Sequence, residues 1–140
     1  MESVKDTLFG YAKYRGEGHW AFVLHRISGL ATLLFLTLHI ATTATVFFAP
    51  AMYDQLVLTF RNPLIMIAEI ILAFFVVYHG VNGLRIAYID LFRPDLWERE
   101  KSHKLTRGVF ITTLILWLPA LGIMGYNLLK YGFGLFGATH

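Results

Sequence analysis

Residues 64–92 of this chain, LIMIAEIILAFFVVYHGVNGLRIAYIDLF, decide its fold. The stretch is apolar almost throughout, and its only charged or imidazole side chains are Glu69, His79, Arg85 and Asp90. About 20 apolar residues are enough for a helix to cross a hydrocarbon core of about 30 Å. The stretch therefore predicts a membrane-spanning helix over residues 63–92, with Pro63 suited to its first turn.

Two further apolar runs flank this stretch. No charged residue occurs from Ile27 to Tyr53, so we expect a helix over residues 21–48 that ends before Pro50. Charge disappears again after Arg107, which predicts a third helix over residues 108–130, kinked at Pro119. The sequence thus predicts an all-α membrane protein of three transmembrane helices. Residues 1–140 form one membrane domain in this interpretation, and residues 1–19 form a polar arm.

The composition excludes several other classes of protein. Hydrophobic residues make up 56% of the chain and charged residues 15%, whereas soluble domains have about 45–50% and about 25%. The basic residues collect in short segments between apolar runs, which is the pattern of a membrane protein and not of a nucleic-acid-binding face. The chain contains no cysteine, so thiolate metal sites, iron–sulfur ligation and covalent haem attachment by this chain are excluded.

The basic residues also indicate the orientation of the helices. The first predicted loop holds only Arg61, whereas the amino-terminal arm and the second loop hold the remaining basic residues near the membrane: Lys5, Lys13, Arg15, Arg93, Arg99, Lys101, Lys104 and Arg107. The positive-inside rule places such segments in the cytoplasm. We therefore expect a multi-pass protein of the cell inner or plasma membrane, with a cytoplasmic amino terminus and the carboxyl terminus on the outer side.

His79 is the residue with the strongest chemical implication. It lies eleven residues before Asp90, so at a rise of 1.5 Å per residue it is about 16 Å from the cytoplasmic end of its helix. An imidazole at that depth needs either a hydrogen bond to another helix or a metal ion. Gly83 follows one turn later on the same face and leaves room for a flat macrocycle. A neutral imidazole nitrogen is a common axial ligand of haem iron.

Two motifs resemble a known family. The run His79-Gly80-Val81-Asn82-Gly83-Leu84-Arg85 with Asp90 resembles the second-helix signature of the cytochrome b556 membrane-anchor (C-type) subunit of succinate dehydrogenase, in respiratory complex II. The run His25-Arg26-Ile27-Ser28-Gly29 resembles the His-Arg-x-Ser-Gly motif in the first helix of the same family. Three helices and the same orientation extend the resemblance over most of the chain.

The resemblance implies a set of site residues. The residue that matches His79 is one axial ligand of haem b, and a second membrane subunit donates the other, so the chain would be half of a heterodimeric haem-binding helix bundle. The residues that match His25, Arg26 and Arg85 lie near the haem propionates and the quinone pocket, and arginine is a good bidentate partner for a carboxylate. Gly83 would pack against the macrocycle. Ser28 and Trp20 are candidates for the quinone site.

The chain departs from the family pattern at two positions. Phe22 replaces a serine associated with the quinone site, which places ubiquinone chemistry by that route in doubt and leaves menaquinone as an alternative. Ile86 replaces a histidine near the propionates.

His39 is a candidate contact for a second haem or for a quinone, or it caps a hydroxyl of its own helix. Glu69 is either a proton relay or an interfacial acid kept neutral by burial.

The resulting prediction is an electron-transfer subunit. It would anchor the flavoprotein and iron–sulfur subunits of a succinate:quinone oxidoreductase, bind one haem b or two, and help to form the quinone site, with no succinate chemistry of its own. A cofactor-free membrane anchor and the cytochrome b subunit of a fumarate reductase are the alternatives.

Overall fold

The computed structural model describes residues 17–97 and 99–135 of the chain, and residues 1–16 of the predicted arm lie outside the described part. The described residues form helices and turns and no strand. The elements in chain order are α2 (Glu17–Phe48), α3 (Pro50–Phe60), α4 (Pro63–Phe92), the short 3₁₀ helix η1 (Pro94–Trp97), α5 (Arg99–Asn127) and the π-helical turn η2 (Leu128–Gly132).

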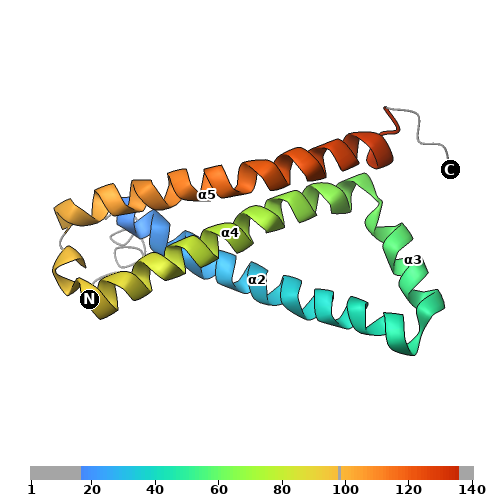
Figure 1. Ribbon diagram of the computed structural model, residues 1–140, viewed down its shortest axis with the longest axis horizontal. Helices are drawn as coiled ribbons and strands as arrows, with labels where there is room; N and C mark the ends of the chain where they lie inside the picture. Colours follow the sequence, from blue (N-terminus) through green and yellow to red (C-terminus); the bar gives the residue numbers. More distant parts are fainter. Residues whose placement is uncertain (1–16, 98, 136–140) are drawn as a thin grey trace, which may run out of the picture.

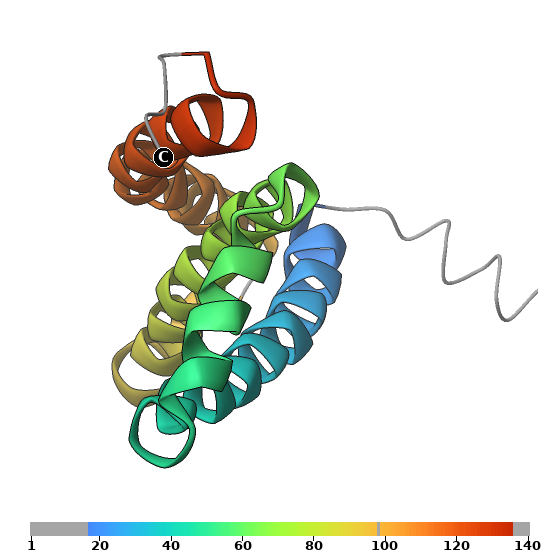
Figure 2. The same cartoon turned by 90° about the vertical axis from the view of Figure 1, so that its right-hand side faces the viewer.

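Three of these helices are long and apolar enough to cross a membrane. The candidate spans are His19–Phe48, Pro63–Phe92 and Lys104–Gly132. Successive spans run in opposite directions, and α4 lies between α5 and α2 (Figure 1, Figure 2). The predicted all-α architecture with three transmembrane helices is confirmed. Helix α5 begins at Arg99 and continues through Pro119, so it includes part of the charged segment before residue 108.

The connection between the first two spans is itself helical. Pro50 begins α3, and the side chain of Asn62 accepts a hydrogen bond from the backbone N–H of Leu64 at 2.9 Å, which caps α4 at its first turn. The connection to α5 is shorter. There the guanidinium of Arg93 donates two hydrogen bonds to the Asp95 carboxylate at 3.0 Å each, which raises the pKa of Arg93 above its usual value.

Aromatic side chains hold α4 against α5. Phe74 meets Trp117 edge to face at 5.5 Å between ring centroids, and Tyr78 packs against Phe110 at 5.3 Å. The indole N–H of Trp117 also donates to the backbone carbonyl of Ile70 at 3.2 Å. Edge-to-face pairs and a satisfied indole N–H are the favourable arrangements for buried aromatic residues. These contacts fix the register of α4 and α5.

Helices α2 and α4 meet over only part of their lengths. They approach at the amino-terminal half of α2 and diverge toward α3, which spans the gap as the third side of a triangle (Figure 1). Residues 33–41 of α2 are all exposed on the surface of the chain. An apolar helix that is uncovered all round is stable only in lipid or against another membrane helix. The polar contacts between α2 and α4 in the described part of the chain accordingly lie at the amino-terminal half of α2.

Tyr78 makes the most deeply buried cross-helix hydrogen bond of the described residues. Its side chain is 0% exposed, and its hydroxyl donates to the backbone carbonyl of Ala21 at 3.1 Å. We expect Tyr78→Phe to lower the free energy of unfolding by about 1 kcal/mol, because the substitution removes that bond and little volume. Denaturant unfolding of the purified protein in detergent, followed by helical circular dichroism, measures this difference. The exposed Tyr88→Phe is the matched control, and equal effects of the two substitutions would contradict the prediction.

Candidate functional site

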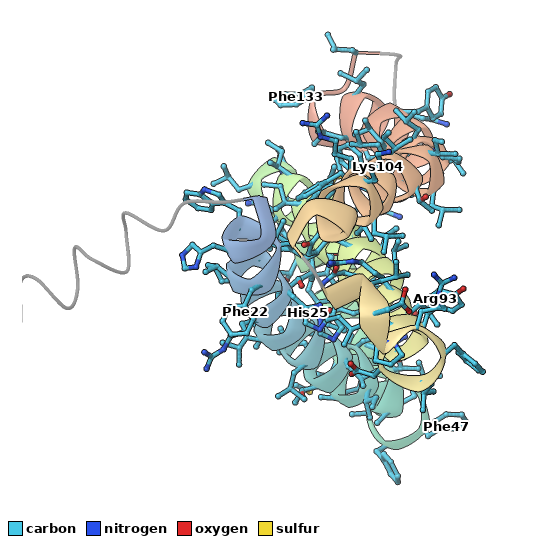
Figure 3. The ribbon with its side chains drawn as sticks, turned by 90° about the vertical axis from the view of Figure 1, so that its left-hand side faces the viewer. Phe22, His25, Phe47, Arg93, Lys104 and Phe133 are labelled. Carbon is cyan, nitrogen blue, oxygen red and sulfur yellow. The ribbon has the colours of Figure 1, made fainter. Side chains whose placement is uncertain are left out.

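The candidate site lies where α2 crosses α4. Its central residue is His79, thirteen residues before the end of α4 at Phe92, which is about 20 Å at 1.5 Å per residue. The facing segment of α2 is residues 25–29, His25 to Gly29, near the amino-terminal end of that helix. Figure 3 shows the His25 side chain on the side of α2 that faces the other helices, whereas Phe22 points outward. The site therefore brings together the two sequence motifs.

His79 is held by the backbone of α2. Its Nδ1 lies 3.2 Å from the carbonyl oxygen of His25. A carbonyl can only accept a hydrogen bond, so Nδ1 carries the proton and donates it. The neutral imidazole then has its lone pair on Nε2, and no hydrogen bond within the described residues reaches that atom. The arrangement presents one neutral nitrogen at lipid depth as a free ligand, which is the tautomer that binds a metal ion.

Ser28 completes the hydrogen bonding around this imidazole. Its side chain is 0% exposed, and its hydroxyl donates to the same carbonyl oxygen of His25 at 2.9 Å. Its Oγ lies 3.4 Å from Nδ1 of His79. Since the hydroxyl proton points to the carbonyl, the oxygen is left to face the imidazole N–H as a second, longer acceptor. Both groups next to Nδ1 therefore stabilise the same tautomer.

Gly29 allows the close approach of the two helices. A Cβ atom on this residue would lie 2.9 Å from Cε1 and 3.4 Å from Nδ1 of His79. The first distance is shorter than a carbon–carbon contact can be without displacement of one partner. Gly29 is part of the first sequence motif, but no role was predicted for it. Its position four residues after His25, on the same helix face, was the available signal.

His25 lies directly on His79. The two rings are stacked with their centroids 4.3 Å apart and their planes 5° from parallel. The Nδ1 atom of His25 is buried and has no hydrogen-bond partner among the described residues. A Cβ on Gly83 would meet Cε1 of His25 at 3.8 Å, an ordinary contact. Gly83 thus lies beside His25, and Nδ1 of His25 is a buried polar atom without a hydrogen-bond partner among the described residues.

A buried polar stripe of α4 continues from this site. Tyr78, Asn82 and Arg85 lie at helical spacing on one face, and the amide oxygen of Asn82 accepts from Nη1 of Arg85 at 3.2 Å. Asn82 is 1% exposed. The Arg85 side chain is therefore partly buried between helices instead of extending freely to the membrane surface. Tyr78 and Asn82 were missed as site residues, although two polar side chains flanking His79 in an apolar helix were a usable signal.

Other predicted site residues lie outside this cluster. Arg26 is exposed on α2, with its guanidinium 5.6 Å from the ring centroid of Phe22. Trp20 is 57% exposed and meets only His19 edge to face, at 6.4 Å. His39 is exposed on the carboxyl-terminal half of α2 and stacks on Phe35 of its own helix at 5.4 Å between ring centroids. Glu69 lies ten residues before His79, in the amino-terminal half of α4.

The side chains that could ligate a metal ion limit what this chain can bind by itself. Within residues 17–97 and 99–135, no three His, Asp or Glu side chains come together as a metal site. His25 and His79 are stacked face to face, so their nitrogens are not aimed at a common point between them. Two axial ligands of one macrocycle must approach its iron from opposite faces. Within the cluster, the imidazole of His79 therefore combines a bonded Nδ1 with an Nε2 that has no hydrogen-bond partner among the described residues.

Two comparisons relate this chain to known proteins. The family described as succinate dehydrogenase/fumarate reductase transmembrane subunit matches residues 10–120 of the chain. The succinate dehydrogenase 2 membrane subunit SdhC of Mycobacterium tuberculosis (strain ATCC 25618 / H37Rv) is 29% identical over 119 residues, which cover 84% of this chain and 85% of that protein. Both matches include the His25–Gly29 crossing on α2, since the family match spans residues 10–120 and the pairwise match covers most of each chain.

The close crossing of α2 and α4 predicts different effects of alanine at two nearby glycines, Gly29 and Gly80. We expect Gly29→Ala to lower the free energy of unfolding by about 1–3 kcal/mol relative to Gly80→Ala, because the new methyl group would overlap the His79 ring. Gly80 is the matched control, since a Cβ there meets nothing within 4 Å and both substitutions gain the same helix propensity. Chemical unfolding in detergent gives the difference. Equal stabilities would mean that α2 and α4 cross less closely than described.

Proposed function

Since the chain belongs to the succinate dehydrogenase/fumarate reductase transmembrane subunit family, we propose that it is the cytochrome b membrane-anchor subunit of a succinate:quinone oxidoreductase. In this role it binds haem b together with a second membrane subunit. It also forms part of the quinone site and anchors the flavoprotein and iron–sulfur subunits. The chain itself carries out no succinate chemistry.

One observation carries this proposal: the hydrogen bond from Nδ1 of His79 to the carbonyl oxygen of His25, at 3.2 Å. Metal-ligating histidines generally donate their second ring N–H to a carbonyl or carboxylate, which fixes the ring and raises its basicity as a ligand. His79 has this arrangement near the middle of a membrane-spanning helix. Its Nε2 lone pair would otherwise be left without a partner in an apolar medium.

The residues around His79 fit a haem. His79 would hold the iron through Nε2, and the buried Nδ1 of His25, which lacks a partner among the described residues, would face a polar edge such as a propionate. Arg85, partly buried one and a half turns from His79, and the exposed Arg26 would supply cations for the propionates. When bound, the haem supplies a one-electron redox centre within the membrane.

A second membrane subunit follows from the donor set. His25 and His79 are stacked face to face, so they would not bind one iron from opposite sides, and the second axial ligand would come from another chain. The exposed outer half of α2, residues 33–41, offers an apolar surface for the helices of such a subunit. By the positive-inside rule the amino-terminal end of α2 would lie in the cytoplasm, where the soluble subunits would bind and where quinone reduction could draw protons from water.

The quinone site is best placed at the same end of the bundle. Trp20 is exposed near the start of α2 and can line a pocket that the partner subunits complete. Ser28 is fully buried with its hydroxyl already bonded, so we assign it to His79 and not to the quinone. His39, exposed in the outer half of α2, remains the candidate contact for a second haem or quinone. The quinone is menaquinone or ubiquinone.

A cofactor-free anchor is the second candidate, and one observation favours it. The Nδ1 bond of His79 already joins α2 to α4, so the imidazole has a structural role whether or not iron is bound. The same helices would then only fix a peripheral complex to the membrane. The reverse reaction, fumarate reduction, uses the same membrane subunit architecture and is included in the family description.

The two candidate functions predict different visible absorption spectra for the assembled complex. We expect membranes that contain the assembled complex to give a b-type haem band in the reduced-minus-oxidised spectrum, and we expect His79→Ala to lose it because the iron loses its protein ligand. His39→Ala is the control with the same substitution on the exposed part of α2, and it should keep the band. A colourless wild-type complex would leave only the anchor role, and loss of a separate spectral component in His39→Ala would assign a second haem to that residue.

A further inference from the structure

We propose that Ser28 is a positioning residue that, with the backbone carbonyl of His25, sets the tautomer and basicity of His79 and thereby the midpoint potential of the haem. This inference rests on the function proposed above and goes beyond it. Neither the ligand role of His79 nor the family assignment requires Ser28 to act on the redox potential. The inference depends on where the Ser28 proton points.

The geometry around Ser28 assigns each hydrogen atom. The hydroxyl of Ser28 and Nδ1 of His79 both lie within hydrogen-bond distance of the His25 carbonyl oxygen, at 2.9 and 3.2 Å. The helical bond from the N–H of Gly29 occupies one lone pair of this oxygen, so the hydroxyl and the imidazole N–H share the other. The hydroxyl then has no proton to give to His79, so its oxygen lone pairs face Nδ1 at 3.4 Å. The three groups form a closed triangle in which Nδ1 always carries a proton.

Burial makes this triangle effective. Ser28 is 0% exposed, so water does not compete for its hydroxyl or for the imidazole N–H. A hydroxyl that donates to a carbonyl becomes a better acceptor at its own oxygen, and in Ser28 that oxygen is the one that faces the imidazole N–H. An imidazole whose N–H has stronger acceptors gains imidazolate character and becomes a more basic ligand. A more basic ligand favours ferric over ferrous iron, so the triangle should lower the midpoint potential.

The bonding of Thr32 provides a contrast on the same helix face. Its hydroxyl donates to the backbone carbonyl of Ser28 at 2.7 Å, a bond within α2 one turn farther on. Thr32 therefore resembles Ser28 in making a side-chain bond back to its own helix. Unlike Ser28, it makes no hydrogen bond with His79 among the described residues. A general effect of hydroxyl groups on α2 would appear at both positions, whereas an effect on the imidazole would appear at Ser28 alone.

Redox potentiometry of the purified complex tests the inference. The haem spectrum is recorded at stepped potentials for the wild type, Ser28→Ala and Thr32→Val. We expect Ser28→Ala to retain haem and to shift the midpoint potential upward, because the imidazole N–H loses one acceptor. Thr32→Val keeps the volume, removes a hydroxyl that does not touch His79, and should leave the potential at the wild-type value. Thermal unfolding of each complex, measured in parallel, reports any purely structural effect.

The outcomes separate this inference from the function on which it rests. A wild-type complex without haem overturns the proposed function. A Ser28→Ala complex that holds haem at an unchanged or lowered potential overturns the role of Ser28 alone, as does an equal shift in Thr32→Val. Should Ser28→Ala lose its haem, Ser28→Cys carries the same test, because a thiol is a weaker donor and acceptor than a hydroxyl. For Ser28→Cys we expect a midpoint potential above the wild-type value, and an unchanged or lowered potential overturns the role of Ser28.

Discussion

The hydrogen bond between the His79 imidazole and the His25 carbonyl is the constraint on which the arrangement of this protein depends. An imidazole near the middle of a membrane has no water to bond with, so its N–H must find an acceptor on a neighbouring helix. Backbone carbonyls of a helix are already bonded within it, but each has a second lone pair. The carbonyl of His25 uses that lone pair, at 3.2 Å. The positions of α2 and α4 follow from it.

A side chain as short as histidine can reach a backbone carbonyl only if the helices are close. Gly29 supplies that closeness, because any side chain there would meet the His79 ring. Close contact at one point of two long straight helices also forces them apart elsewhere, and α3 spans the resulting gap (Figure 1). The exposed outer half of α2 is thus a consequence of the tight crossing. Lipid or a partner helix must cover that surface.

The sequence was sufficient for the fold and for the central residue. A long run with few charged residues directly predicts a membrane-spanning helix, and a single imidazole within such a run is easily recognised. The spatial relation between the two motifs was harder to predict. Periodicity assigns residues to the faces of one helix, but it does not say which face contacts which neighbouring helix. His25 was therefore predicted to lie near haem propionates, a role that remains a prediction, and its stacking on His79 was not foreseen. The roles of Gly29, Tyr78 and Asn82 were not predicted, because they depend on how the helices pack against one another.

Under the proposed function, helix assembly and redox chemistry would depend on the same atoms. The His79 N–H that joins α4 to α2 leaves Nε2 as the nitrogen that would bind iron, and the glycine that permits the crossing lies in the same motif as His25. The opposite axial ligand would come from another chain, and lipid or a partner helix would cover the exposed part of α2. A partner subunit would satisfy both requirements, so a mutation that disturbs the crossing affects ligand geometry and subunit association together.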